Sequence, residues 1–456
     1  MAKYKAYPEY KDSGVDFLGL VPNEWSIKSL KNIVMIFNGS TPKSGVEEYW
    51  DGDVNWITPT DLSQKSGVYL TDSQRKITKK GLDSCGTSLV PENTVILSTR
   101  APIGSLAITG TQSCTNQGCK SLVAKYKENS LFLYYYLSIS TSPLKNLGRG
   151  STFLELSTED LASFKVPMPN VGIGTIVSFL EHETAKIDNL IEKQQQLIEL
   201  LKEKRLAVIS HAVTKGLNPD VSMKDSGVEW LGEVPEHWDI ISISKLSRKI
   251  TNGYVGPTRD ILVDQGIPYI QATHIKKGVI NFDGSYFVNR SWSEAHEKSI
   301  LSKGDVLIVQ TGAGTGDIGL VSDQESGFNC HALIIVQPNC NLISGHFLSI
   351  VLQASYGQST LYSIRTGGMH PHLNCGEVQF VKIPVPPRTE QDLISDFITS
   401  KLDIFEKLID KQINAIALLQ ERRTALISAA VTGKIDVRDW VAPGTQNFEE
   451  LQEATA

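Results

Sequence analysis

Two stretches, KDSGVDFLGLVPNEW at 11–25 and KDSGVEWLGEVPEHW at 224–238, decide the fold of this 456-residue chain. They carry one motif at an offset of 213 residues, the difference between 224 and 11. Further along, EKRLAVISHAVTKG at 203–216 answers ERRTALISAAVTGK at 421–434. Ordered matches at nearly one offset indicate an internal duplication.

The segments between these matches are similar only in outline. WITPTDL at 56–62 corresponds to YIQATHI at 269–275, and NTVILSTRAPIGSLAI at 93–108 corresponds to GDVLIVQTGAGTGDIGLV at 304–321. Short β-rich apolar runs broken by Gly, Pro, Asn and Asp predict mixed globules built round a twisted sheet. We expect the following prolines to end the ladder and lead the chain out of each sheet: Pro167, Pro169, Pro384, Pro386 and Pro387.

A heptad pattern follows each proline exit. The apolar seams, each with one glutamine, are Leu180, Ile187, Gln194, Leu201 and Val208, and then Ile398, Phe405, Gln412, Leu419 and Leu426. Residues such as Leu190 and Leu197 widen the first seam into a stripe. The spacing predicts helices from about 173 to 214 and from about 391 to 432, each roughly 60 Å long.

The ends of both helices carry their own signals. Thr389 with Asp392 predicts a capping box at the start of the second helix. Gly216 and Gly433 follow the last periodic residues and predict C-terminal stops.

Equivalent apolar stripes in one chain predict that the two helices pack on each other. A pseudo-twofold axis would make them antiparallel and place the globules at opposite ends of the rod. We expect Gln194 and Gln412 to meet near that axis and fix the register. Two alternatives stay open: each helix packs only on its own globule, or both glutamines are solvated.

The predicted fold class is mixed α+β, with two globular domains joined by two long antiparallel, coiled-coil-like helices in a pseudo-twofold duplication. Trp25 and Trp238 are expected to close each leader onto its domain, whereas Trp50, Trp56 and Trp292 are expected to pack rather than stack on a ligand. The expected segments are a leader (1–22), a first domain (23–169), a first helix (170–216), a linker with the second leader (217–235), a second domain (236–387), a second helix (388–434) and a tail (435–456).

The net charge of −6 does not exclude nucleic acid. Residues 23–165 hold 15 Lys/Arg against 13 Asp/Glu, and residues 236–383 hold 11 against 12, so most excess acid lies elsewhere. No run is long enough for a membrane span, and the N-terminus lacks the apolar core of a secretory signal. Six cysteines without a CxxC pair indicate a reduced, cytoplasmic location.

The sequence contains no complete catalytic motif: no GxxxxGK[ST], no HExxH and no paired CxxC. Asn218-Pro219 lacks the aromatic of an amino-methyltransferase Asn-Pro-Pro-Tyr loop. The glycine run 312–316 is interpreted as a turn, and the histidines at 370 and 372 with Cys375 lack an evident fourth metal ligand. We therefore expect no catalytic residue, no metal and no cofactor.

The chain resembles the specificity (S) subunits of type I DNA restriction–modification systems. The resemblance rests on the doubled leader, on NGSTPKSGVEEYWDGDVNWITPTDL at 38–62 and on PVPPRTEQ at 384–391. The chain departs from the family at 169–173, where a Pro…Glu-Gln start is common.

The resemblance implies a DNA-specificity subunit. Each domain would be a target recognition domain for one half of a bipartite, asymmetric site in double-stranded DNA, and the helix pair would set the gap. Two modification (methyltransferase) subunits would dock on helices and leaders. Restriction (motor/nuclease) subunits would join through them, and this chain would be non-catalytic.

Base recognition requires side chains that reach base edges, supported by cations on phosphates. The first-domain candidates are Thr41, Lys43, Thr58, Thr60, Arg75, Lys76, Lys79, Lys80, Arg100, Arg149 and Ser151. The second-domain candidates are Asn252, Tyr254, Gln271, His274, Lys276, Lys277, Gln310, Arg365 and His370. Among them, the basic runs at 75–80 and 276–277 are assigned to phosphates, with solvated turns as the alternative.

Partner binding is assigned to exposed helix faces, with an ordinary solvated face as the alternative. The candidates are Lys202, Glu203, Lys204, Arg205, Gln420, Glu421, Arg422 and Arg423. Two other functions stay open: an enzyme, either a fused methyltransferase or a nuclease that recognises its own site, and a two-headed protein scaffold that binds no DNA.

Overall fold

The computed structural model forms two compact units. Neither unit is simply one half of the chain, because the C-terminal residues belong to the first unit. The first unit comprises residues 1–194 with 414–456, and the second unit comprises residues 195–413. The structure describes residues 4–65, 67–100, 102–149, 154–276, 278–367 and 371–442. Ser151, Lys277 and His370 lie outside the described residues, as does the tail from Gly444. Within the described ranges, no helix combines the length and apolarity that crossing a membrane requires.

The described part of the first unit is built on a five-stranded sheet of order β4-β11-β8-β9-β6. Its strands are β4 (Val34–Asn38), β11 (Cys119–Ala124), β8 (Val95–Ser98), β9 (Leu106–Thr109) and β6 (Tyr69–Leu70). Every residue of β8 and β9 is buried, which explains why these strands are continuous apolar runs rather than alternating ones. A smaller sheet contains β10 (Ser113–Thr115), β5 (Trp50–Ile57) and β7 (Lys76–Ile77).

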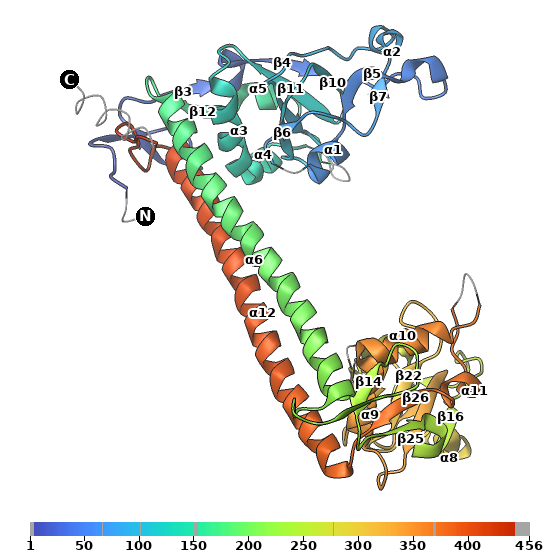
Figure 1. The fold of residues 1–456 in the computed structure, drawn as a ribbon. Helices are drawn as coiled ribbons and strands as arrows, with labels where there is room; N and C mark the ends of the chain where they lie inside the picture. Colours follow the sequence, from blue (N-terminus) through green and yellow to red (C-terminus); the bar gives the residue numbers. More distant parts are fainter. Residues whose placement is uncertain are drawn as a thin grey trace, which may run out of the picture. The chain divides into compact units, whose positions relative to one another are not determined.

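Short helices surround these sheets (Figure 1). They are η1 (Leu30–Asn32), η2 (Glu47–Tyr49), α1 (Pro59–Gln64), α2 (Lys79–Asp83), α3 (Asn129–Ile139), α4 (Thr141–Asn146) and α5 (Thr158–Ser163). The longest of them, α3, supplies the fully buried Phe132, Leu133 and Tyr136 to the main core.

The second unit repeats this plan. Its main sheet has the order β16-β25-β22-β23, with β16 (Ser247–Asn252), β25 (Leu333–Pro338), β22 (Val306–Val309) and β23 (Ile318–Leu320). Its second sheet contains β17 (Leu262–Val263), β21 (Phe287–Val288), β18 (Ile267–Ile270) and β24 (Asn329–Cys330). The remaining short elements are α7 (Ile243–Leu246), η3 (Ala272–His274), β19 (Ile275–Lys276), β20 (Val279–Ile280), α8 (Arg290–Ala295), η4 (Glu297–Ser299), α9 (Gly345–Gln353), α10 (Ser355–Ser363) and α11 (Cys375–Val378).

The duplication therefore extends to topology. In each unit the small sheet holds one parallel pair, β5 with β10 and β18 with β24. The predicted correspondence of the two WITPTDL-type segments is confirmed, because β5 leads through Thr58 into α1 as β18 leads through Gln271 into η3. The second predicted correspondence is confirmed too, since β8–β9 and β22–β23 are both antiparallel pairs.

The prediction that prolines end each ladder is confirmed for Pro169, Pro386 and Pro387, which follow the last strand residues, and is wrong for Pro167 and Pro384. Pro167 lies inside β12 (Lys165–Met168), which pairs with β3 (Ser26–Ser29), and Pro384 lies inside β26 (Lys382–Val385), which pairs with β15 (Asp239–Ser242). Each pair has only two strands, so the missing proline N–H deprives no third strand of a donor.

Each of the two long helices has one end in the first unit and the other end in the second. Helix α6 (Ile173–Lys215) starts in the core of the first unit through Ile176 and Leu180, where the end of α12 (Arg388–Val431) also packs through Val431. In the second unit the end of α6 meets the start of α12. The helices are therefore antiparallel in each unit, as predicted, and the alternative that each packs only on its own domain is wrong.

Their stripes are narrower than the sequence predicted. Leu180 and Ile187 of the first seam are buried, as are Ile398 and Phe405 of the second. In contrast, Leu190 and Leu197 are 46% and 39% exposed, so they lie at the margin of the seam, where Leu190 lines a cavity between the helices of the first unit.

Gln194 and Gln412 belong to different units, and their meeting stays a prediction. Gln194 Oε1 is buried and has no hydrogen-bond partner among the described residues.

Both predicted C-terminal stops are confirmed. Gly216 and Gly433 have φ of 76° and 71°, the left-handed region that favours glycine. Each glycine also packs on a leader tryptophan, because a Cβ would lie 3.3 Å from Cζ2 of Trp238 or of Trp25, respectively. Both indole rings are buried, which confirms their predicted closing role.

The start of α12 corrects a second prediction. The helix begins at Arg388, so Thr389 lies inside its first turn and is not the N-cap. Gln391 does the anchoring instead: it is fully buried, accepts from Ser344 N at 3.0 Å and donates to the carbonyls of Leu342 and Pro386 at 2.8 and 2.9 Å.

Replacing Gln391 with Leu is expected to destabilise the second unit by about 2–4 kcal/mol. The apolar side chain would leave one N–H and two carbonyls buried without partners. The loss of unfolding free energy is measured by urea unfolding, with hydrogen exchange of the α9 amides as the readout. Gln420→Leu, on an exposed position of the same helix, is the control and should cost less than about 0.5 kcal/mol. Equal effects of the two substitutions would contradict the anchoring role.

Candidate nucleic-acid interface

A loop between β10 and β11 brings several first-domain candidates together. Thr41 Oγ1 donates to Oε1 of Gln117 in this loop. A Cβ on Gly39 would lie 1.9 Å from the carbonyl oxygen of Asn116, and one on Gly118 would lie 3.2 Å from Nε of Arg100. The glycines thus permit close packing that places Thr41 and Arg100 on either side of one short loop.

A three-way backbone junction adds Arg149. Glu155 forms isolated β-bridges to both Arg100 and Arg149. In the second domain, His372 forms the same two bridges, to Thr311 and Thr366. We call these two places the junctions. The candidates Gln310 and Arg365 are direct chain neighbours of the second junction, so sequence reasoning selected the same structural place twice.

An asparagine lies under each junction. Asn38 Oδ1 accepts from Lys120 Nζ at 2.9 Å and from Thr158 Oγ1 at 3.0 Å. In the second domain, Asn252 Oδ1 accepts from Cys375 Sγ at 2.9 Å. Asn252 and Asn38 are equivalent residues, and the Oδ1 atom of each accepts a hydrogen bond from a side chain near its junction. We therefore interpret both asparagines as residues that hold the junction in place.

Lys120 is a junction residue that sequence reasoning missed. It is only 8% exposed, and this burial lowers the pKa of its ammonium group. The signal that could have found the site is the Asn-Gly pair at 38–39, repeated at 252–253. Glu155 and Gln117 carried no comparable signal.

Arg75, in the first-domain basic run, contacts two tryptophan rings. Its side chain is exposed, and its Cζ lies 3.8 Å from the centroid of the Trp50 ring and 5.8 Å from that of Trp56. The indole N–H groups of these tryptophans donate to Lys43 O at 3.3 Å and Ser40 O at 2.9 Å. Both rings are buried, which confirms their predicted packing role and gives Arg75 a rigid cation–π platform.

The other cations of this run are partly neutralised. Lys76 pairs with Asp72 at 3.0 Å and Lys80 pairs with Glu48 at 2.9 Å, both at the surface. Lys43 and Lys79 are exposed. Arg149, at the junction, pairs with Asp160 at 2.9 Å while its side chain stays 80% exposed.

Thr58 has a structural role. Asp61 N donates to its Oγ1 at 3.5 Å, and its own N–H donates to Asp61 Oδ2 at 2.8 Å, which forms a capping box for α1. Thr60, in the first turn of the same helix, is exposed.

Two second-domain candidates are buried, which contradicts their assignment to base edges. His274 is 3% exposed because its Nδ1 accepts from Gln271 N at 2.9 Å and its Nε2 lies 3.2 Å from Asp283 Oδ1. Gln310 is 6% exposed at the end of β22. Gln271 is half-buried, and Lys276 is exposed.

Arg365 reaches into the glycine run. Its Nη2 donates to the carbonyl of Thr315, and its Cζ lies 4.9 Å from the Tyr362 ring centroid. Gly316 has φ of 91°, and a Cβ there would lie 2.7 Å from Arg365 Nη2. The run is therefore the β22–β23 turn, as interpreted from the sequence, and it receives an arginine.

Tyr254 belongs to an aromatic cluster. Its ring meets those of Trp292 and His296 edge-on, with centroids 5.0 and 5.1 Å apart. Trp292 and His296 are stacked at 4.0 Å. An open cavity of about 670 Å³ next to Tyr254 and His296 makes this face concave.

The helix candidates for partner binding divide into paired and exposed residues. Arg423 of α12 makes two hydrogen bonds, of 2.8 and 3.2 Å, to Asp188 of α6 in the first unit. Lys202 pairs with Glu199 at 2.8 Å, and Arg205 is only partly exposed. The remaining candidates are exposed: Glu203, Lys204, Gln420, Glu421 and Arg422.

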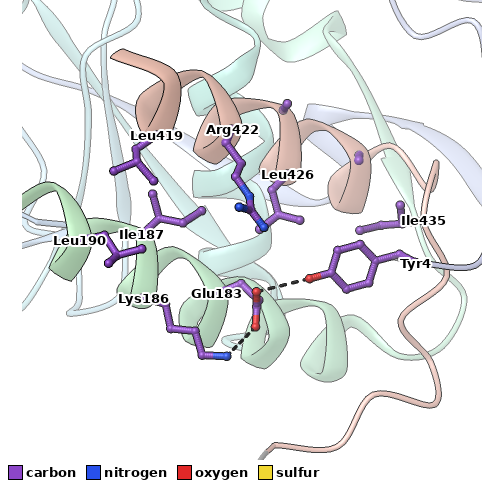
Figure 2. Close-up of a pocket in the computed structure, with 11 residues that line it drawn as sticks. Tyr4, Glu183, Lys186, Ile187, Leu190, Leu419, Arg422, Leu426 and Ile435 are labelled. Carbon is purple, nitrogen blue, oxygen red and sulfur yellow. Dashed lines mark hydrogen bonds and ion pairs between the residues drawn. The ribbon is translucent and has the colours of Figure 1, made fainter. Parts of the chain in front are cut away.

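Arg422 also lines a cavity of about 330 Å³ between the two helices of the first unit (Figure 2). Tyr4 Oη donates to Glu183 Oε2 at 3.3 Å, and Lys186 Nζ lies 2.9 Å from Glu183 Oε1. Among the described residues, no group of three or more His, Cys, Asp or Glu could hold a metal ion.

Two unlike polar faces on one duplicated framework define a bivalent recognition protein. The family model described as type I restriction modification DNA specificity domain matches residues 22–200 and again 235–417. These two matches cover most of the chain, so the chain belongs to that family.

Relatives and solved structures agree. The chain is 27% identical to the type I restriction enzyme MjaIX specificity subunit of Methanocaldococcus jannaschii, over 96% of this chain and 99% of that one. It is 24% identical to the EcoBI specificity subunit of Escherichia coli, over 70% and 68%. The fold matches a chain from a type I R-M system structure (TM-score 0.69, 15% identity, 91% and 99% covered) and the HsdS subunit of Thermoanaerobacter tengcongensis (0.52, 15%, 91% and 98%).

Proposed function

We propose that this chain selects the DNA site of a type I restriction–modification complex. Each domain recognises one half of a bipartite, asymmetric site, and the helix pair fixes the gap between the halves. Two methyltransferase subunits dock on the shared framework, and restriction subunits join through them. The chain itself contributes no reacting group, metal or cofactor, and works in the cytoplasm.

One observation carries this proposal: the two units share the order of four main-sheet strands and the junctions, but differ in the side chains at the junctions. Arg100, Arg149 and Glu155 in the first domain correspond to Thr311, Thr366 and His372 in the second. A shared framework serves partners that are the same for both halves. Different exposed side chains serve two different base sequences, because bases are distinguished by donor and acceptor patterns.

Exposed cations support DNA as the ligand of these faces. Lys43 and Lys79 in the first domain and Lys276 in the second are exposed around the candidate surfaces. Cations that contact phosphates give sequence-independent affinity, and base contacts then give specificity. Two modules in one chain also raise affinity through effective concentration.

Mapping methylated adenines tests the proposal. The chain is co-expressed with the methyltransferase subunit of its own system, and the host genome is sequenced for N6-methyladenine. We expect one split, asymmetric site with a constant gap. Methylation at a single uninterrupted or palindromic site, or none, would refute the two-domain assignment.

The alternatives have separate tests. Adenine methylation by this chain alone with S-adenosylmethionine would favour the fused enzyme. Absence of salt-sensitive binding to duplex DNA would favour the two-headed protein scaffold that binds no DNA, because phosphate contacts require an affinity that falls with added salt.

We assign Arg75 to a guanine in the first half-site rather than to a phosphate. Arg75 Cζ lies over the Trp50 ring, 3.8 Å from its centroid, and the side chain is exposed, so the guanidinium is held where it can make a bidentate contact to guanine O6 and N7. Arg75→Ala should reduce methylation of sites with that guanine about 10- to 100-fold and relax specificity at one position, as scored across the methylated genome.

The control for Arg75 is Lys79→Ala. Loss of an exposed phosphate-type cation should weaken binding to all sequences alike and reduce the salt slope by about one. Arg75→Lys keeps the charge but cannot form the bidentate contact, so it should behave like the alanine variant. Uniform weakening by all three variants would restore the phosphate assignment.

A further inference from the structure

The two leader hairpins share more than their sequence. The first joins β1 (Tyr10–Asp12) to β2 (Leu20–Pro22), and the second joins β13 (Met223–Asp225) to β14 (Glu233–Pro235). In the first turn, Gly14 N donates to Asp12 Oδ1 at 2.9 Å and Ser13 N donates to Gly19 O at 3.0 Å.

The second turn repeats these bonds, with Gly227 N to Asp225 Oδ1 and Ser226 N to Gly232 O, both at 3.0 Å. The two loops therefore share these hydrogen bonds, although Trp230 has positive φ and its counterpart Phe17 does not.

Each turn presents an aromatic ring to the outside. Phe17 is 46% exposed and Trp230 is 58% exposed, whereas the next residues, Leu18 and Leu231, are 5% and 6% exposed. Trp230 also has φ of 67°, an unfavourable conformation for a residue with a Cβ. Burial of the neighbouring leucine accounts for the fold of each turn, but it does not account for a large exposed ring at the same position in both.

The first ring lies at the edge of a hollow. Phe17 stacks on Phe164, with ring centroids 5.4 Å apart and planes 8° apart. An adjoining cavity of about 550 Å³ is lined by Pro143 and Leu147 as well as by these rings. Phe17 thus offers one face to Phe164 and contributes the other to an apolar surface that another molecule can cover.

Charge argues against DNA at these turns. Residues 9–24 contain four carboxylates and one lysine, and the equivalent residues 222–237 also contain four carboxylates and one lysine. An acidic surface repels phosphates, whereas an exposed aromatic ring in a polar surround is typical of a protein–protein anchor.

The duplication identifies the partner. A motif that exposes an aromatic ring at the same position in both units suits a partner that is present twice, whereas the halves of an asymmetric DNA site differ. We propose that the hairpins containing Phe17 and Trp230 are equivalent anchors for two copies of one protein, each ring entering an apolar pocket rimmed by basic side chains. The identification of that protein as the methyltransferase subunit rests on the proposed function.

Stoichiometry tests the anchors. The full chain is co-purified with the methyltransferase subunit of its own system, and the mass of the complex is measured by native mass spectrometry. Phe17→Ala or Trp230→Gly should remove one of two partner subunits at concentrations where the unchanged chain binds two, with at least a tenfold weaker affinity at that site. Glycine suits the positive φ of Trp230, so this variant keeps the turn.

Controls separate docking from folding. Tyr126→Ala removes another exposed ring of the first unit (68% exposed) and should leave two partners bound. Trp230→Phe should retain the second partner, because it keeps a ring. Thermal unfolding must match the unchanged chain for each variant compared.

The outcomes are distinct from those for the proposed function. If the Phe17→Ala, Trp230→Gly double variant binds two partners within twofold of normal affinity, the anchors are refuted. The split methylation site could still be intact in that case. If the unchanged chain binds no methyltransferase subunit, the proposed function fails instead.

Discussion

Replacing residues 34–164 with the matching segment of another family member is expected to change one half of the methylated site completely. This segment runs from β4 to α5 and contains the first junction and Arg75. The original half-site should fall to the level of non-specific DNA, a loss of about a thousandfold or more. The second half-site and the gap should stay unchanged, because the framework that determines them stays in place.

The cut points follow from the packing. They leave β3, β12 and both long helices with the recipient, so the contact between Gly433 and Trp25 is preserved. The donor segment must supply an apolar helix in place of α3, because Phe132 packs with Trp25 at a centroid distance of 6.4 Å. Thermal unfolding shows whether this interface has formed.

The reciprocal exchange is the control. Replacing residues 247–381, from β16 to just before β26, should change only the other half of the site. Methylome sequencing identifies each half-site and the gap in both hybrids. A hybrid whose two half-sites both change would show that the domains do not recognise DNA independently.

The overall plan was predictable because a repeat constrains both copies. The offset of 213 residues located matching strands, and the seven-residue spacing located α6 to within a residue or two of Ile173–Lys215. The start of α12 was less predictable, because Thr389 offers a local cap but the tertiary bonds of Gln391 favour an earlier start. The prediction that Pro167 ends its strand was wrong for a related reason. Its strand pairs with a single, distant segment of the chain, and the local sequence does not show this pairing.

The candidate site was predictable in place but less so in role. Arg100, Arg149 and Arg365 were selected because they follow apolar strands or helices, and strand ends meet at sheet edges. His274 was selected on the same ground, yet its two ring nitrogens satisfy local partners and bury it. Lys120 was missed because it stands within an apolar strand, where the sequence does not show that Asn38 faces it across the ladder.

Deleting one heptad from each helix, Gln194–Leu200 and Gln412–Leu418, is expected to shorten the gap by about three base pairs. Seven residues span about 10.5 Å of helix, and a base pair rises about 3.4 Å. Seven residues also fall only about 20° short of two full helical turns, so the seam of Leu180 and Ile187 keeps its orientation.

Both half-sites should stay the same in this deletion variant, because no residue of either domain changes. Methylation should be weaker than normal, since three base pairs turn the duplex by about 100° and the protein or DNA must twist to compensate. Deleting Gln194–Leu200 alone is the control: it mismatches the two helices and should abolish the complex. A methylome that keeps its original gap after the paired deletion would show that something other than helix length sets the spacing.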